Sequence, residues 1–382
     1  MKYFQKIALA ILALSLYGPA QADINVGVIL SLTGQAASLG VPERDTVLLW
    51  PKNIGDQKLN LTILDDASDP TAATLAARKL ITEHKVDFIA GPSTTPAALA
   101  VLQVAGETRT PMIAIAGGGA IVAPMEGARR WVFKTPPEEA IQLSLVFKQM
   151  KKNNQKRLGV VAVNSAYGQT FVDSLQKIAA GAGIEITSVE RFGGTDTSFV
   201  SQALKMITSK PDAILIVAAG TPAAMPQLEL KRRGFAGTFF QTQAVANNDY
   251  LRVGGKDVEG TYMPVSPLLV AEQLPDSNPT KKVGMAYVKL YEDKYGANTR
   301  SLFGGSAWSV FMLLDNAVPT ALKHAKPGTA GFRLALRDAL EQTKDLTLPE
   351  GVYSMSPTDH NGADERSQVL VKIENGKWRY VD

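Results

Sequence analysis

The 382-residue chain contains no cysteine. A protein without cysteine forms no disulfide bonds, and it cannot be tethered to a membrane through a lipidated N-terminal cysteine. Only one long apolar run occurs, near the start, and no later stretch is long enough to span a bilayer. These absences exclude a disulfide scaffold, a lipoprotein and a membrane-embedded protein.

The single apolar run has the features of a secretory signal. It covers residues 7–17, follows Lys2 and Lys6, and ends at Gly18-Pro19. Its length of roughly eleven residues is about half of what a membrane span needs. Ala20-Gln21-Ala22 supplies the small residues at which signal peptidase cleaves. We predict cleavage after Ala22 and a periplasmic location, with an uncleaved anchor or a core helix as the alternative.

Catalytic and metal-binding patterns are missing as well. The three histidines, His84, His324 and His360, are far apart, and none has a metal-ligand spacing. No GxSxG motif, no P-loop and no GxGxxG after a strand is present. Asp65-Asp66 could be a metal or acid–base pair, although such residues more often cap turns. We therefore predict no enzymatic activity, no cofactor and no metal.

Charge and composition describe an ordinary globular protein. The formal net charge is +4, the apolar fraction is 45% and the charged fraction is 20%. Basic residues are mixed with acidic ones and form no stripe with interleaved aromatics, so neither nucleic acid nor a membrane surface is indicated as a partner. A mature chain of about 360 residues is long enough for two domains.

Short apolar, β-branched runs alternate with helical patterns in two separate series. This alternation is typical of βαβ units and parallel sheets. Between the series lies Lys134-Thr135-Pro136-Pro137, where proline favours an extended linker. We predict two doubly wound α/β sheets. The expected strands are 24–30, 59–64, 86–90, 111–116, 158–163, 184–191, 213–218 and 238–243, and the expected helices are 38–53, 71–83, 96–107, 138–152, 168–182, 199–208 and 223–233.

The last third of the chain adds helices and a hairpin. Asn375-Gly376 stands between alternating apolar residues, which is the strongest short-range signal for a β-hairpin. We predict strands over 369–374 and 377–381 joined by that turn. A second proline-rich connection, 260–279, precedes helical patterns over 280–295, 306–324 and 329–343.

Groups able to bind a ligand gather at strand ends, the usual ligand position in open α/β sheets. Ser93-Thr94-Thr95 offers three hydroxyls beside a helix start, whose N–H groups suit a carboxylate. Alternatively, Thr95 only caps its helix. Ala116-Gly117-Gly118 lets a ligand approach the backbone closely. In the second series, Tyr167 could contact a ligand through its ring or hydroxyl, or it could pack in the core.

The order and spacing of several short motifs resemble those of the periplasmic leucine/isoleucine/valine-binding proteins, over nearly the whole mature length. The motifs are Val26-Gly27-Val28 with Leu32-Thr33-Gly34, Asp65-Asp66 with Asp69-Pro70, Gly91-Pro92-Ser93-Thr94-Thr95, Tyr167-Gly168-Gln169, Pro357-Thr358-Asp359-His360-Asn361-Gly362, Val369-Leu370-Val371 and Asn375-Gly376-Lys377-Trp378.

The resemblance implies the type I periplasmic binding protein fold, which is two Rossmann-like lobes joined by three hinge crossovers, with a ligand in the cleft. The crossovers are expected near residues 135, 264 and 347. After a signal peptide over 1–22, lobe I would contain 23–135 plus 264–347. Lobe II would contain 136–263 plus 348–382.

The resemblance also implies site residues. Thr95 corresponds to the hydroxyl and amide that hold a ligand carboxylate, and Ala116 and Gly118 correspond to groups that assist it. Tyr167 corresponds to a cleft tyrosine of lobe II. Three positions depart from the pattern. Gln243 replaces the acidic partner of the α-ammonium, Gly220 replaces a second tyrosine, and Leu39 replaces an aromatic residue.

Moving an ammonium group out of water without a carboxylate partner costs several kcal/mol of free energy. We therefore expect a ligand that keeps a carboxylate and lacks a free α-ammonium, such as an aromatic or branched acid, with a hydrophobic amino acid as the alternative. The expected role is that of the solute-binding component of an ABC importer. The protein would act as a monomer and deliver its ligand to an inner-membrane permease by hinge closure. A ligand-sensing subunit with the same cleft is the alternative function.

Overall fold

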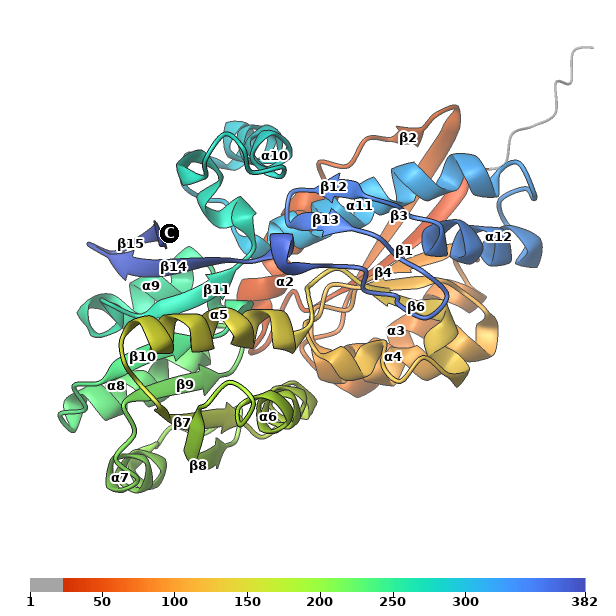
Figure 1. Cartoon of the computed structure of the whole chain (residues 1–382). Coiled ribbons are helices and arrows are strands. Elements are labelled where there is room, and N and C mark those ends of the chain that lie inside the picture. Colours follow the sequence, from red (N-terminus) through yellow and green to blue (C-terminus); the bar gives the residue numbers. More distant parts are fainter. Residues whose placement is uncertain (1–22, 382) are drawn as a thin grey trace, which may run out of the picture.

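The computed structural model describes residues 23–381, which form two α/β lobes side by side (Figure 1). The sheet of the first lobe has the strand order β2-β3-β1-β4-β5-β6, and that of the second has the order β15-β14-β11-β10-β9-β7-β8. The predicted signal peptide lies outside the described residues. The predicted fold class, two doubly wound lobes, is confirmed.

The first sheet is buried on both faces. In β1, Val26 and Val28 belong to one apolar cluster and Ile29 belongs to another, and all three are fully buried. Such strands read as continuous apolar runs because both faces are covered. The elements of this lobe are β1 (Ile24–Leu30), α2 (Ala37–Val47), β2 (Asn53–Ile54), β3 (Gln57–Asp65), α3 (Pro70–Thr82), β4 (Phe88–Ala90), α4 (Thr95–Thr108), β5 (Met112–Ala114) and β6 (Val132–Lys134).

The second sheet repeats the arrangement and ends in the predicted hairpin. Asn375 and Gly376 both have positive φ, as the tight turn between β14 and β15 requires, and the two strands pair antiparallel. The elements are α5 (Glu139–Lys152), β7 (Arg157–Val163), α6 (Ala166–Ile178), β8 (Glu185–Phe192), α7 (Val200–Thr208), β9 (Ala213–Val217), α8 (Ala224–Arg232), β10 (Thr238–Gln241), α9 (Asn248–Gly254), β11 (Tyr262–Val265), β14 (Val369–Glu374) and β15 (Lys377–Val381).

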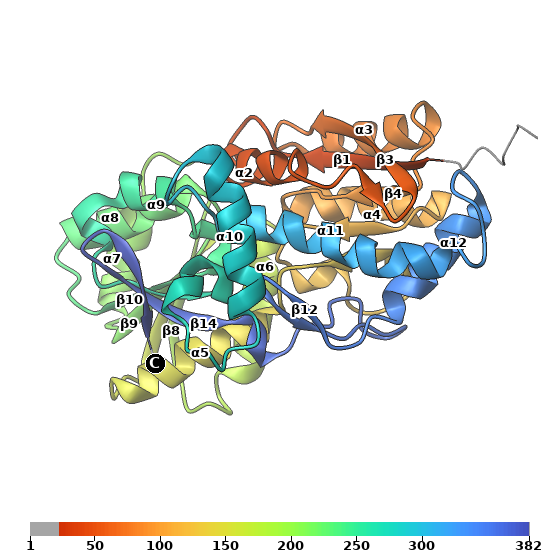
Figure 2. The same cartoon turned by 90° about the horizontal axis from the view of Figure 1, so that it is seen from above.

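Between β11 and β14 the chain returns to the first lobe, where it adds α10 (Lys281–Tyr295), α11 (Leu302–Ala321), α12 (Ala330–Glu341), β12 (Leu346–Leu348) and β13 (Gly351–Tyr353). Figure 2 shows α11 running from the second lobe along the first. Accordingly, Leu302 and Phe303 belong to an apolar cluster of the second lobe, and the rest of the helix packs in the first.

Most expected elements are present, but some boundaries were wrong. The helix expected over 38–53 ends at Val47, because Asn53 and Ile54 pair with β3 as a short antiparallel strand. The helix expected over 306–324 begins at Leu302. Ser301 caps it there, since its Oγ accepts a hydrogen bond from Gly304 N at 3.3 Å.

Three crossovers join the lobes, and two of them are bound to each other. Lys134 is fully buried at the first crossover, and its Nζ donates to the carbonyl oxygens of Gly117, Pro136 and Pro137. From the third crossover, Asn361 Nδ2 donates to the carbonyl oxygens of Lys134 and Pro136, at 3.1 and 2.9 Å.

The exact lobe boundaries stay a prediction. A third crossover near residue 347 was expected, and we propose a later position, after residue 355. Leu348, Tyr353 and Met355 pack in the apolar cluster of the first sheet, which favours the later position.

Helix α2 touches the backbone at the end of β1, and glycine makes this contact possible. A Cβ on Gly40 would lie 2.2 Å from the carbonyl oxygen of Ser31. This contact fixes α2, and with it Leu39, at the centre of the molecule.

We predict that Gly40→Ala lowers the free energy of unfolding by about 2 kcal/mol or more, because backbone atoms must move to admit the methyl group. Urea unfolding of the purified protein measures the change. Gly181→Ala is the control, since its Cβ would meet nothing closer than 3.7 Å. Equal stability of the two variants would contradict the packing argument.

Candidate functional site

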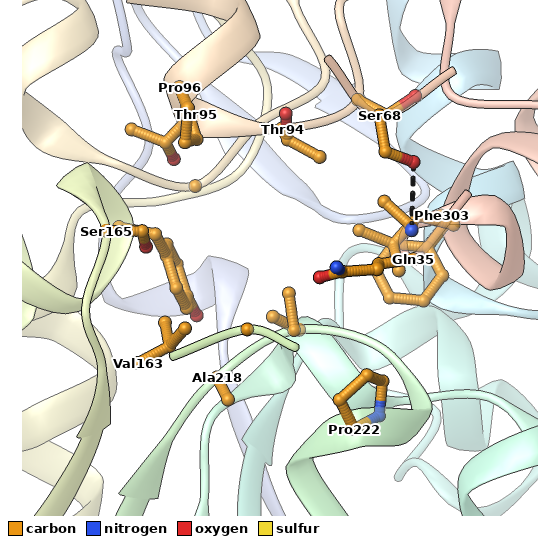
Figure 3. A pocket seen from close by; sticks show the side chains of 18 of the residues that line it. Gln35, Ser68, Thr94, Thr95, Pro96, Val163, Ser165, Ala218, Pro222 and Phe303 are labelled. Atoms are coloured by element: carbon orange, nitrogen blue, oxygen red, sulfur yellow. Dashed lines mark hydrogen bonds between the residues drawn. The ribbon is translucent and has the colours of Figure 1, made fainter. Parts of the chain in front are cut away.

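A cavity of about 220 Å³ lies between the lobes. In Figure 3, Ser68, Thr94 and Thr95 stand on one side of it, Val163, Ala218 and Pro222 stand on the other, and Gln35 extends into the space. The cavity is smaller than the roughly 300–1,000 Å³ typical of drug-sized ligands, so it suits a compact solute. The remaining lining residues are Ala36, Leu39, Ser93, Pro96, Ile115, Gly117, Pro136, Asn164, Ser165, Tyr167, Phe192, Gly194, Ala219, Gln243, Ala244, Leu302, Phe303 and Ser306.

Four helices begin at this cavity. Residues at or next to the first turns of α2, α4, α6 and α11 all line it. The first N–H groups of a helix have no partner within the helix, and the macrodipole places partial positive charge at that end. The cavity therefore favours a negatively charged guest.

The lining contains hydroxyl and amide groups but no aspartate, glutamate, histidine, lysine or arginine. An anion in this cavity would be held by dipoles and hydrogen bonds alone. A cation would find no counter-charge on the lining. The hydrogen-bonding side chains of the lining are Gln35, Ser68, Ser93, Thr94, Thr95, Asn164, Ser165, Tyr167, Gln243 and Ser306.

One of the two expectations for Thr95 was that it caps α4, and this expectation is wrong. The helix begins at Thr95 itself, Thr94 occupies the N-cap position, and no side chain caps the helix. The hydroxyl of Thr95 accepts a hydrogen bond from Gly118 N at 3.0 Å. Thr95 therefore keeps its own hydroxyl hydrogen for a guest. In the first turn of α4, Pro96 has no N–H, so the N–H groups of Thr95 and Ala97 are the ones that no side chain caps.

Tyr167 reaches the cavity from α6 and is buried. Its hydroxyl donates to Thr242 Oγ1 at 2.9 Å, and its ring packs edge-on against Phe171. Burial raises the pKa of Tyr167, so the phenol is neutral. Its ring lies 3.2 Å from the position of a Cβ on Gly117. With its hydroxyl hydrogen used by Thr242, Tyr167 offers the cavity an aromatic surface.

Gln243 presents a donor to the cavity. Its Oε1 accepts a hydrogen bond from Gln368 Nε2 at 2.9 Å. The same nitrogen of Gln368 donates to the carbonyl oxygen of Ser367, and a carbonyl can only accept, which fixes the orientation of both amides. One of the two acceptor sites of Gln243 Oε1 is thus used by Gln368.

The structure brings seven of the ten predicted site residues to the cavity wall: Leu39, Ser93, Thr94, Thr95, Gly117, Tyr167 and Gln243. The other three, Ala116, Gly118 and Gly220, lie outside the lining. Gly118 N donates a hydrogen bond to the hydroxyl oxygen of Thr95. Gly220 has positive φ, and a Cβ there would lie 3.0 Å from Ser38 Oγ, so lobe contact fills the space of the expected tyrosine.

Sequence reasoning missed Gln35, Ser68, Phe192, Phe303 and Ser306. None of them belongs to a recognisable motif. They reach the cavity because the lobes dock and because α11 begins four residues earlier than its apolar pattern indicates.

Three carboxyl groups with raised pKa values are buried behind the cavity wall, and no salt bridge to them forms within residues 23–381. Burial raises the pKa of Glu43 well above its usual range, raises that of Asp66, and raises that of Glu350 to about 7. Two of them touch cavity serines. Ser93 Oγ lies 2.5 Å from Glu43 Oε2, and Ser306 Oγ lies 2.5 Å from Glu350 Oε1.

The other candidates have structural surroundings. Asp65 accepts hydrogen bonds from the N–H groups of Leu32 and Ala67, as a turn-capping residue does. His360 is buried at the third crossover, stacked on Phe133. Within residues 23–381, no cluster of three or more potential metal ligands occurs, and no helix is long and apolar enough to cross a bilayer.

Known proteins resemble this chain along its whole described length. Residues 23–377 match the sequence model of the family described as periplasmic binding protein. An extracellular ligand-binding receptor of Rhodopseudomonas palustris has 42% identity and a TM-score of 0.91, over 94% of this chain and 99% of that one.

More distant relatives have named ligands. A Leu/Ile/Val-binding protein of Rhizobium johnstonii has 23% identity over 94% of both chains. An ABC-transporter solute-binding protein of R. palustris, solved in complex with benzoate, has 21% identity and a TM-score of 0.78, over 94% of this chain and 96% of that one.

We predict that Glu350→Gln stabilises the protein at alkaline pH. Because the folded-state pKa is raised from 4.5 to about 7, the stability contributed by protonated Glu350 is lost as pH rises through that value. The free energy of unfolding that is lost in this way amounts to about 3 kcal/mol. Urea unfolding should give a larger advantage of the variant at about pH 8 than at about pH 5. Glu365→Gln, at an exposed position, is the control. If the stability difference between Glu350→Gln and wild type is the same at both pH values, the raised pKa assigned to Glu350 is contradicted.

Proposed function

Because this chain belongs to the periplasmic binding protein family, we propose that it captures a small organic carboxylate without an α-ammonium group for an ABC importer. The observation that carries this proposal is the combination of four helix N-termini with a cavity lining free of charged side chains. An aromatic acid or a branched aliphatic acid fits the combination.

The carboxylate would lie at the first turn of α4. Thr94, Thr95 and Pro96 line the cavity there, and the helix has no capping side chain that would compete for its N–H groups. Thr95 would donate its hydroxyl hydrogen, and charge-assisted hydrogen bonds of this kind are about twice as strong as neutral ones.

An α-ammonium group would be left without a partner. No carboxylate lines the cavity, and Gln243, at the position of the family's acidic residue, is a neutral amide whose oxygen already accepts from Gln368. The amide nitrogen of Gln243 would instead repel an ammonium and could donate to a second carboxylate oxygen or a ring hydroxyl.

The apolar part of the ligand would contact aromatic and aliphatic side chains from both lobes. Tyr167 and Phe192 come from the second lobe. Leu39 comes from α2 of the first lobe, and Phe303 comes from the start of α11. Rings prefer offset or edge-on contact with one another, which these side chains allow on two sides of a planar guest.

Capture would proceed by hinge closure. The lobes touch at the cavity rim, where Asn247 Nδ2 of the second lobe donates to the carbonyl oxygen of Ser38 in the first at 3.1 Å. A guest held by both lobes adds to this contact and stabilises the closed form, which a membrane permease would then recognise. The protein would work as a monomer and without a catalytic step.

We predict that calorimetric titration gives tighter binding of benzoate than of leucine, by about tenfold or more, since an unpaired buried charge costs several kcal/mol. Gln243→Glu adds a negative charge to the lining and should lower benzoate affinity by about tenfold or more. Gln227→Glu, at a buried position outside the lining, controls for a new buried charge elsewhere. Tight binding of leucine without any binding of benzoate would overturn the ligand class.

We also predict export with cleavage after Ala22, because the small residues of Ala20-Gln21-Ala22 follow a short apolar run. Mass spectrometry of the protein from the periplasmic fraction should give a chain that begins at Asp23. A full-length chain retained in the membrane fraction would contradict export and cleavage.

A further inference from the structure

Ser93 is buried in the cavity lining, and its hydroxyl has two polar neighbours. Its Oγ accepts a hydrogen bond from Ser31 N at 3.0 Å and lies 2.5 Å from Glu43 Oε2. A hydroxyl has one hydrogen and two acceptor sites. If Glu43 is ionised, the hydrogen of Ser93 points at Glu43 and away from the cavity. If Glu43 is protonated on Oε2, Glu43 is the donor, and the hydrogen of Ser93 is free.

The surroundings of Glu43 favour the protonated form. The side chain is fully buried in α2, its Oε1 has no hydrogen-bond partner, and no salt bridge to it forms within residues 23–381. The titratable groups that act on it are acidic: Asp66, directly after β3, and Glu350, in the turn between β12 and β13.

We infer that Glu43 is a positioning residue, held as a neutral acid that donates to Ser93, so that the Ser93 hydroxyl turns its hydrogen into the cavity toward the ligand carboxylate. The inference rests on the proposed function, because it assigns Ser93 a place in the binding of an anion. No sequence motif marks Glu43, and it does not line the cavity.

Ionisation of Glu43 reverses the arrangement. The proton leaves to solvent, Ser93 rotates its hydrogen back to the carboxylate, and a negative charge appears behind the wall that faces the ligand. Affinity for a carboxylate therefore falls as pH rises through the raised pKa of Glu43, by up to about tenfold per pH unit. Binding above that pKa takes up a proton.

The test is calorimetric titration with benzoate between about pH 6 and about pH 9, where benzoate stays ionised. Wild-type affinity should fall with rising pH. Glu43→Gln replaces the acid with an amide that donates at every pH, so it should bind within about threefold of wild type at the acidic end and show a smaller fall. The fall that remains belongs to Glu350, whose pKa is raised to about 7 and whose carboxyl contacts Ser306 of the cavity lining. Ser93→Ala should lose about tenfold at the acidic end, and adding Glu43→Gln to it should lose no more.

Asp87→Asn is the matched control. Asp87 is also a buried acid, but it binds Asn25 N and Gly328 N, which lie outside the cavity lining. This variant should keep the wild-type pH dependence. A wild-type pH slope in Glu43→Gln, or unchanged affinity in Ser93→Ala, would overturn the inference and leave benzoate binding intact.

Infrared spectroscopy tests the protonation without any ligand. The difference spectrum between wild type and Glu43→Gln at neutral pH should contain the carbonyl stretch of a protonated carboxylic acid. Its absence would overturn the inference. If the band is present and no carboxylate binds, the proposed function fails and the protonation state of Glu43 stands.

Discussion

The convergence of four helix N-termini on one enclosed space is the constraint on which the rest of the site depends. Partial positive charge at the ends of α2, α4, α6 and α11 makes the cavity suitable for an anion without any basic side chain. The dipoles are fixed by the backbone, so they need no reorganisation when a guest arrives. Both lobes contribute helices, and the full field exists only when the lobes are docked.

Buried acids lie behind the wall of this cavity. No salt bridge to Glu43, Asp66 or Glu350 forms in the described part of the chain, and burial raises the pKa of each. Two of them, Glu43 and Glu350, contact serines of the cavity lining, and in its neutral form such an acid adds no charge that opposes a bound carboxylate. The same property makes these positions sensitive to alkaline pH.

Local rules predicted much of the fold. Asp69 and Pro70 fix the start of α3, and Asn375-Gly376 fixes the last hairpin, because in each case a few adjacent residues determine the backbone. Strand-end motifs also identified the α4 side of the cavity.

Other parts of the site depend on distant contacts that no local pattern contains. Phe303 reaches the cavity through a helix cap at Ser301 and through lobe docking. The donor role of Gln243 depends on Gln368, which is 125 residues away in the chain. Whether Thr95 caps its helix or faces a guest was undecidable from the sequence, since both roles use the same residue type at the same place.

The hydrogen bonds between the first and third crossovers have a mechanical consequence. Lys134 and Asn361 bind the same short segment, so the two connections cannot slide past each other. These hydrogen bonds restrain relative motion of the lobes at the two crossovers. Under the proposed hinge closure, this restraint would return Thr95 and Tyr167 to the same separation each time the lobes close.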